Sequence, residues 1–233
     1  MARRWPSYVI CALIVQSLAA CSDEPAAGNS GAPPVTKQNN AAQATDRKLV
    51  VAFGDSLYAG YGVAQHESFP RELEKNLRAQ GHAVEVRNAG VSGETTQGGL
   101  QRLVFTLDGL PRKPDLVLLG LGGNDMLRGL DPKQSEKNLR AMLDILKARN
   151  LPVLLTGMIA APNMGSDYSR RFNAIYPDLA KEYAVPLYPF FLEGVIGKSK
   201  YMQPDSLHPN ALGVGIVAEK IAPLVSRSLT AAH

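Results

Sequence analysis

The sequence predicts an α/β protein with three layers, in which a five-stranded parallel sheet lies between two layers of helices. From Lys48 onward, short apolar runs alternate with segments of helical periodicity, and this alternation is typical of parallel sheets that are covered on both faces. The chain contains no internal repeat, and about 180 residues are enough for one hydrophobic core. We therefore expect one α/β domain over residues 47–230.

The five predicted strands are short apolar runs rich in valine and leucine. They cover residues 48–53, 83–87, 115–120, 152–158 and 185–188. The carboxyl ends of parallel strands meet at one edge of a sheet, and ligands bind there. Residues that follow these runs are therefore the first candidates for a functional site.

Helices are predicted between the strands and at the end of the chain. They cover residues 69–80, 96–108, 132–149, 169–184 and 209–229. The third of these shows the pattern well, because its apolar residues recur at spacings of three and four and so share one face. Asp131 can cap this helix, and Pro132 fits its first turn, where a missing N–H does no harm.

Residues 1–20 are interpreted as a signal peptide. Arg3 and Arg4 form a basic start, and an apolar run ends at Ala20; this run is too short to span a bilayer, which takes about 20 apolar residues. The Leu-Ala-Ala-Cys sequence at 18–21 resembles a bacterial lipobox, which implies that Cys21 is lipidated. The alternatives are an ordinary signal peptide with an incidental cysteine, or an uncleaved anchor.

Residues 21–46 are expected to form a flexible tether. They contain almost no large apolar side chain, so burial cannot offset the entropy lost on ordering. The domain is thus expected in the periplasm, anchored to a bacterial membrane through Cys21. Ser22, in place of an acidic residue, slightly favours the outer membrane.

Charge and cysteine usage exclude several classes of function. The formal net charge is +4 and includes Arg3 and Arg4; no basic cluster with interleaved aromatic residues occurs, so nucleic acid is not an expected partner. The two cysteines, Cys11 and Cys21, both precede the domain, which leaves it without cysteines at metal-ligand spacing. We expect no metal and no cofactor.

Ser56 is the candidate nucleophile. It follows the first predicted strand within Gly54-Asp55-Ser56-Leu57, although a serine at a strand end is more often a turn or a helix cap. The strained Gly-x-Ser-x-Gly turn of the α/β-hydrolases is absent, because Tyr58 stands at the position of its second glycine. A different serine-hydrolase fold is indicated.

His208 is the candidate general base, and Asp205 is the carboxylate that would orient it. Asp205 lies three residues earlier in a turn that ends at Pro209, so it can reach the imidazole nitrogen that does not face the serine. A helix-capping turn is the alternative for this pair. The other histidines, His66, His82 and His233, are interpreted as surface residues.

An acyl hydrolase also needs N–H donors for the negative oxygen of its tetrahedral intermediate. The side-chain amide of Asn124, which follows the third predicted strand, suits this role, together with the backbone N–H groups of Ser56 and Gly93. Glycine permits close approach of the backbone to a substrate. A loop-capping amide and a turn glycine are the alternatives for Asn124 and Gly93.

Taken together, these segments resemble the SGNH or GDSL hydrolase family. The matching blocks are Gly54-Asp55-Ser56-Leu57, Gly93, Gly122-Gly123-Asn124-Asp125, and Asp205 with His208. The resemblance covers most of residues 48–225 and is strongest to the bacterial exported thioesterase, arylesterase and lysophospholipase branch. It implies a flavodoxin-like fold, catalytic Ser56, Asp205 and His208, and an oxyanion hole of Ser56, Gly93 and Asn124.

The resemblance also implies a serine esterase that hydrolyses carboxylic esters and acyl thioesters through an acyl-enzyme on Ser56. The expected partners are a small-molecule substrate and, through the lipidated N-terminus, a membrane; the oligomeric state is left open. Candidate pocket residues, all apolar, lie on loops predicted to rim the site: Met126, Leu127, Ile159 and Met164, with Tyr168 as a further one. A carbohydrate O-deacetylase on the same triad and a non-catalytic binding lipoprotein are the alternatives.

Overall fold

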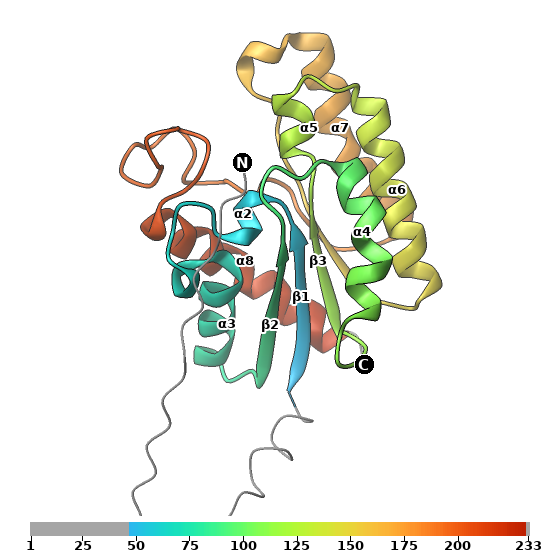
Figure 1. Cartoon of the computed structure of the whole chain (residues 1–233), viewed down its shortest axis with the longest axis vertical. Helices are drawn as coiled ribbons and strands as arrows, with labels where there is room; N and C mark the ends of the chain where they lie inside the picture. The colour runs from blue at the N-terminus through green and yellow to red at the C-terminus, as the bar shows by residue number, and fades with distance from the viewer. Residues whose placement is uncertain (1–46, 232–233) are drawn as a thin grey trace, which may run out of the picture. The chain divides into compact units, whose positions relative to one another are not determined.

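The computed structural model describes residues 47–231 (Figure 1). The segments interpreted above as signal peptide, Cys21 and tether lie outside the described residues, so their assignment remains a prediction. Within residues 47–231, no helix combines the length and the apolar character that crossing a membrane requires.

All five predicted strands are present, and they form one parallel sheet in the order β2-β1-β3-β4-β5. Their bounds are β1 Lys48–Gly54, β2 Val84–Gly90, β3 Leu116–Gly120, β4 Val153–Thr156 and β5 Leu187–Tyr188. This strand order is that of flavodoxin-like folds. The predicted fold class is therefore confirmed.

Helices cover both faces of the sheet (Figure 1). One face packs against α3 (Phe69–Ala79) and α8 (Ala211–Ala231). The other face packs against α4 (Thr96–Asp108), α6 (Pro132–Ala148) and α7 (Ser166–Tyr183). All five long helices predicted from periodicity are thus present, with bounds that differ by up to three residues.

Two short helices were not predicted, and both follow strands of the sheet. They are α2 (Ser56–Ala59) after β1 and α5 (Gly123–Leu127) after β3; each is too short to show a helical period. Two 3-10 turns, η1 (Gln65–Glu67) and η2 (Pro162–Met164), were also missed. Because α2 and α5 carry Ser56 and Asn124, the segments that sequence periodicity could not assign are those that bear the candidate site.

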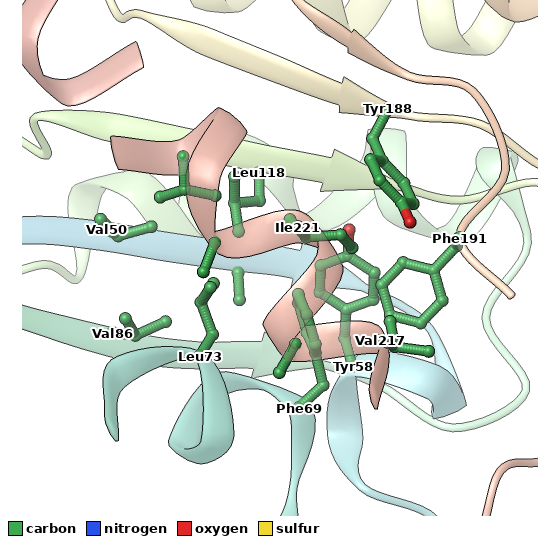
Figure 2. Close-up of a cluster of buried hydrophobic side chains, with 14 of the residues drawn as sticks. Val50, Tyr58, Phe69, Leu73, Val86, Leu118, Tyr188, Phe191, Val217 and Ile221 are labelled. Atoms are coloured by element: carbon green, nitrogen blue, oxygen red, sulfur yellow. The ribbon is translucent and has the colours of Figure 1, made fainter. Parts of the chain in front are cut away.

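The apolar runs of the strands are continuous because each strand is buried on both faces. In β1, Val50 and Ala52 join the cluster under α3 and α8, whereas Val51 and Phe53 join the cluster on the opposite face. Figure 2 shows the first cluster, in which side chains from three neighbouring strands face the two helices; it includes Val50, Val86, Leu118, Leu73, Val217 and Ile221. The sheet is thus a rigid base for the loops at its carboxyl edge.

Three glycines end β1, β2 and β3 in register, because Gly54 pairs with both Gly90 and Gly120. A Cβ at Gly54 would lie 2.5 Å from Cγ of Tyr58, and one at Gly120 would lie 2.5 Å from the Thr156 hydroxyl. Helix α2 therefore rests directly on the strand ends.

The Tyr58 ring fills the space that these glycines leave. Its hydroxyl is hydrogen-bonded to Thr156 Oγ1 at 2.7 Å, and it packs against the rings of Phe69 and Phe191 (Figure 2). Tyr58 stands at the position where an α/β-hydrolase turn has its second glycine, and here its side chain is buried. It fixes the short helix that begins with Ser56.

Replacing Gly120 with alanine is expected to destabilise the fold by about 1–3 kcal/mol, because the methyl group would overlap the Tyr58 hydroxyl and overpacking costs energy of this order. Urea denaturation measures the change. Gly215→Ala is the matched control: this glycine lies in α8 with no atom near its added Cβ, so alanine there should be neutral or stabilising. Equal unfolding midpoints for the two variants would contradict the steric role of Gly120.

Candidate active site

Ser56 is the first residue of α2 and lies at the carboxyl edge of the sheet. Asp55 caps this helix, since its Oδ1 accepts the N–H of Leu57 at 3.0 Å. The cap is supplied by Asp55 and not by Ser56, so the serine hydroxyl is left for other partners. Ser56 is 8% exposed and lines a cavity.

The structure brings Ser56, His208 and Asp205 into one hydrogen-bonded chain. His208 Nε2 lies 2.8 Å from Ser56 Oγ, and His208 Nδ1 lies 2.6 Å from Asp205 Oδ2. The second carboxylate oxygen of Asp205 accepts the backbone N–H groups of Leu207 and His208 at 2.9 and 3.0 Å. Of the other described histidines, His66 is exposed, and His82 is hydrogen-bonded to Ser226.

Hydrogen bonding keeps the Asp205 carboxyl ionised. Burial opposes its ionisation, but the backbone N–H and the imidazole of His208 and the N–H of Leu207 outweigh this effect and lower the pKa of Asp205 to about 2. An ionised carboxylate only accepts hydrogen bonds, so the proton of the neutral imidazole lies on Nδ1. Nε2 is then the acceptor for the Ser56 hydroxyl, which is the tautomer that a general base needs.

Gly93 and Asn124 line the same cavity as Ser56. Gly93 has φ +78°, in the left-handed region that favours glycine, and its carbonyl accepts Arg128 Nη2 at 2.7 Å. The amide of Asn124 donates to the Glu94 carbonyl at 3.0 Å and makes a longer contact of 3.5 Å with Asp55 Oδ2. The structure therefore groups every residue predicted for the triad and the oxyanion hole.

An ion pair that the sequence analysis missed fixes the loop of Gly93. Glu94 is bonded to Arg102 of α4, whose Nε lies 2.7 Å from both carboxylate oxygens. Arg102 also donates to the carbonyls of Gly54 and Ala89 at 3.1 and 2.9 Å, and its guanidinium lies 3.9 Å from the centre of the Phe53 ring. One arginine thus ties the Gly93 loop to the ends of β1 and β2.

A buried polar network fixes α5 in the same way. Asp125 accepts the backbone N–H of Thr96 at 2.8 Å and its hydroxyl at 2.5 Å, and it also accepts the hydroxyl of Ser135 at 3.1 Å. Asn138 completes the network by donating to the Thr96 hydroxyl at 3.0 Å. These bonds join α4, α5 and α6, and they orient the helix that carries Asn124.

The carboxyl group of Asp55 is buried beside the triad. Burial raises its pKa to about 6, and the charge of Glu94 adds to the rise; the N–H of Leu57, the charge of His208 and its own N–H act in the opposite direction. Among the described residues, Asn124 is the only one whose side chain is hydrogen-bonded to the Asp55 carboxyl. Asp55 is therefore a buried carboxyl that titrates near pH 6.

We expect Asp55 to make the protein less stable as the pH rises. The folded-state pKa of Asp55 lies above its ordinary value of 3.8, so protonation of this carboxyl favours the folded state. This contribution to the free energy of unfolding is complete below pH 4 and is lost as the pH passes through 6. The loss is roughly 3 kcal/mol. Asp55→Asn should remove this loss, and urea denaturation at several pH values measures it. A variant that keeps the wild-type slope between pH 4 and 7 would refute the assignment.

A cavity of about 670 Å³ opens beside Ser56 and is lined mainly by apolar side chains. Of the residues predicted to line it, Met126, Leu127 and Ile159 do so. The sequence analysis missed further apolar residues from the loop that leads to α8: Phe190, Leu192, Ile196 and Leu207. No periodicity marks this loop, and its approach to the cavity depends on the path of the chain after β5.

Met164 and Tyr168 do not line this cavity, so the prediction for them was wrong. Met164 ends the 3-10 turn η2 and packs against the core under α6 and α7. Tyr168 stacks on Phe172 of α7 and donates its hydroxyl to the Leu130 carbonyl at 3.0 Å. Both side chains pack against the core. Ala161 and Pro162, from the same loop, line the cavity instead.

Within residues 47–231, no group of three or more histidine, cysteine, aspartate and glutamate side chains is arranged to hold a metal ion.

Comparison with known proteins shows which family the chain is similar to. The profile of the GDSL-like Lipase/Acylhydrolase family matches residues 52–216. The arylesterase of Vibrio mimicus is 43% identical over 182 residues, which cover 78% of this chain and 89% of that protein. Thioesterase 1/protease 1/lysophospholipase L1 of Escherichia coli K12 is 42% identical over 189 residues, or 79% of this chain and 88% of that one.

Two solved structures share the fold over nearly their whole length. AlinE4, an SGNH-hydrolase family esterase, is 47% identical with a TM-score of 0.68, and the match covers 79% of this chain and 97% of AlinE4. TesA is 36% identical with a TM-score of 0.73, and the match covers 78% and 99% of the two chains. The chain belongs to the GDSL-like lipase/acylhydrolase family, also called SGNH hydrolases, and is an ester hydrolase.

Proposed function

We propose that Ser56, His208 and Asp205 form the catalytic triad of this esterase. His208 Nε2 takes the proton of the Ser56 hydroxyl while Oγ attacks the carbonyl carbon of an ester or thioester. The imidazolium then gives this proton to the leaving alkoxide or thiolate, and an acyl group remains on Ser56. Water, activated by the same imidazole, releases the acid. The carboxylate of Asp205 orients the ring and stabilises its charged form.

The oxyanion of both tetrahedral intermediates is assigned to the N–H groups of Ser56, Gly93 and Asn124. One hydrogen of the Asn124 amide is bonded to the Glu94 carbonyl, while the other makes only the 3.5 Å contact with Asp55. This second hydrogen is the one available to a substrate. Donors fixed in advance stabilise the charge as it develops, because they need no reorganisation during the reaction.

The substrate class follows from the cavity, and this is the observation that supports the proposal most directly. The triad opens into a space of about 670 Å³ whose rim includes the half-exposed Leu127 and Ile159. Apolar, flexible side chains favour a hydrocarbon chain or an aromatic ring over a sugar. We therefore assign esters and thioesters with apolar acyl or aryl groups, and include lysophospholipids.

A carbohydrate O-deacetylase would use the same triad, but it calls for a polar, open cleft. A pure binding role is disfavoured by the hydrogen-bonded contact between Ser56 and His208, which a binding module has no need to maintain. The lining of the cavity and the geometry of the triad thus favour the esterase over both alternatives.

A hydrolysis profile tests the proposed substrate class. Purified protein is compared on p-nitrophenyl octanoate, octanoyl-CoA, a lysophospholipid and an acetylated sugar, with Ser56→Ala as the background. We expect kcat/KM to be at least ten times higher for the octanoyl substrates than for the acetylated sugar. A preference for the sugar would support the deacetylase, and failure of a fluorophosphonate to label Ser56 would support the binding role.

We further propose that Cys21 is lipidated and anchors the domain to a membrane in the periplasm, with the outer membrane preferred. This rests on the sequence of residues 1–22. Several acyl chains bind a bilayer far more firmly than one, at about 0.8 kcal/mol per buried methylene.

Cys21→Ser is expected to release the protein from the membrane without changing its esterase activity. Fractionation of cells that express the full chain measures the first effect, and activity in the released fraction measures the second. Membrane association that survives this substitution would refute the lipid anchor.

A further inference from the structure

The catalytic histidine is carried by an exposed turn without regular secondary structure. Asp205, Ser206 and Leu207 are all exposed, and Ser206 has φ +58°, an unusual conformation for a residue other than glycine. The turn lies between β5 and α8. Contacts with other residues must therefore hold the turn so that His208 Nε2 stays within hydrogen-bonding distance of Ser56.

Gln203 closes this turn through its backbone and its side chain. Its N–H donates to the His208 carbonyl at 2.8 Å, and its carbonyl accepts the N–H of Ser206 at 3.0 Å. Its side-chain amide donates to the Pro209 carbonyl at 3.0 Å, beside the isolated bridge of Met202 and Pro209. Gln203 is thus hydrogen-bonded to the carbonyl groups of both His208 and Pro209.

The same side-chain amide also reaches the segment of the nucleophile. Gln203 Nε2 donates to the Tyr61 carbonyl at 2.7 Å, across 142 residues of sequence. Gln203 can reach this carbonyl because residue 62 is glycine, with φ +72°. A Cβ at residue 62 would lie 2.7 Å from Cδ of Gln203 and would block the contact. Both hydrogens of one amide are used, one for each segment.

Tyr61 in turn contacts both members of the reacting pair. Its backbone N–H donates to the Ser56 carbonyl at 3.1 Å. Its ring lies 4.5 Å from the imidazole of His208, centre to centre, with an angle of 38° between the planes. A bond to the Tyr61 carbonyl therefore holds the backbone that carries the ring packed on His208.

From these contacts we propose that Gln203 is a positioning residue for His208, which joins the histidine turn to the Ser56 segment and holds the imidazole in line with the nucleophile. The inference rests on the proposed role of His208 as the base. Gln203 touches no substrate atom in this scheme, since it is absent from the lining of the cavity. Its loss should slow the proton transfer and leave substrate binding intact.

The test compares Gln203→Met with Gln65→Met. Methionine keeps the length of the side chain and removes both N–H donors, while Gln65 is an exposed residue of η1. With p-nitrophenyl octanoate, Gln203→Met should lower kcat by about 10- to 100-fold, the scale of a small misplacement of a reacting group, with KM changed less than threefold. The rate at which a fluorophosphonate labels Ser56 should fall in parallel, and Gln65→Met should match the wild type.

Several results would overturn the inference. They are a wild-type kcat, a rise in KM at unchanged kcat, and a loss of activity equal to the fraction of unfolded protein in thermal denaturation. If Gln203→Met does not fold, Gln203→Asn, which shortens the side chain but keeps its amide, carries the same expectation. Failure of the proposed function would look different, because Ser56→Ala would then keep its activity; a wild-type kcat in Gln203→Met beside an inactive Ser56→Ala rejects the positioning role alone.

Discussion

Replacing Ser56 with alanine is expected to lower kcat for p-nitrophenyl octanoate by about 10⁴- to 10⁶-fold, the loss seen when the nucleophile of a serine hydrolase is removed. The reason is chemical: without Oγ no acyl-enzyme forms, and what remains is the effect of substrate binding and of the oxyanion donors on direct attack by water. Labelling by a fluorophosphonate should disappear with the activity.

The fold should survive this substitution. The hydroxyl of Ser56 does not cap α2, because Asp55 does so. Its side-chain partner is the partly exposed His208, whose imidazole water can satisfy. Urea denaturation should place Ser56→Ala within about 1 kcal/mol of the wild type, and the exposed Ser199→Ala should keep full activity. Retention of most ester turnover by Ser56→Ala would remove the basis of the proposed mechanism.

The parts of the fold that sequence could predict are those whose pattern is local. The strands are continuous apolar runs because both faces are buried, and a helix such as α6 shows its buried stripe in the order of its residues. The grouping of Ser56, Asp205 and His208 was expected because these residues match blocks of the SGNH family and because loops at the carboxyl ends of parallel strands converge at one edge. The strands and helices can be predicted without knowing which side chains contact one another.

The parts that could not be predicted depend on contacts between distant segments. Nothing near Gln203 in sequence indicates that its amide meets the Tyr61 carbonyl, and nothing near Arg102 indicates that it bonds to the ends of two strands. Met164 shows the same limit: its residue type suited a substrate pocket, but the turn of η2 directs it into the core. Residue type suggests what a side chain can do, whereas the path of the backbone decides what it reaches.

The second large effect is expected from His208→Ala, which should lower kcat by about 10⁴- to 10⁶-fold while KM changes little. The Ser56 hydroxyl stays in place but loses the only side-chain acceptor that its proton has within residues 47–231, so it attacks as a neutral alcohol. The turn should persist, because Asp205 still accepts the backbone N–H groups of residues 207 and 208. His66→Ala, which removes an exposed imidazole, is the matched control and should be fully active.

The double variant Ser56→Ala/His208→Ala shows whether Ser56 and His208 act as one catalytic unit or contribute to the rate independently. If the two residues acted independently, their losses would multiply to about 10⁸-fold or more, whereas residues that act as one unit lose together little more than either loses alone. Because Oγ and Nε2 share one proton across 2.8 Å, we expect the double variant to match the single variants within about tenfold. Residual rates are measured at high enzyme concentration with the fluorophosphonate-treated wild type as background. A double variant slower than either single variant by several further powers of ten would mean that His208 assists a reaction in which Ser56 takes no part.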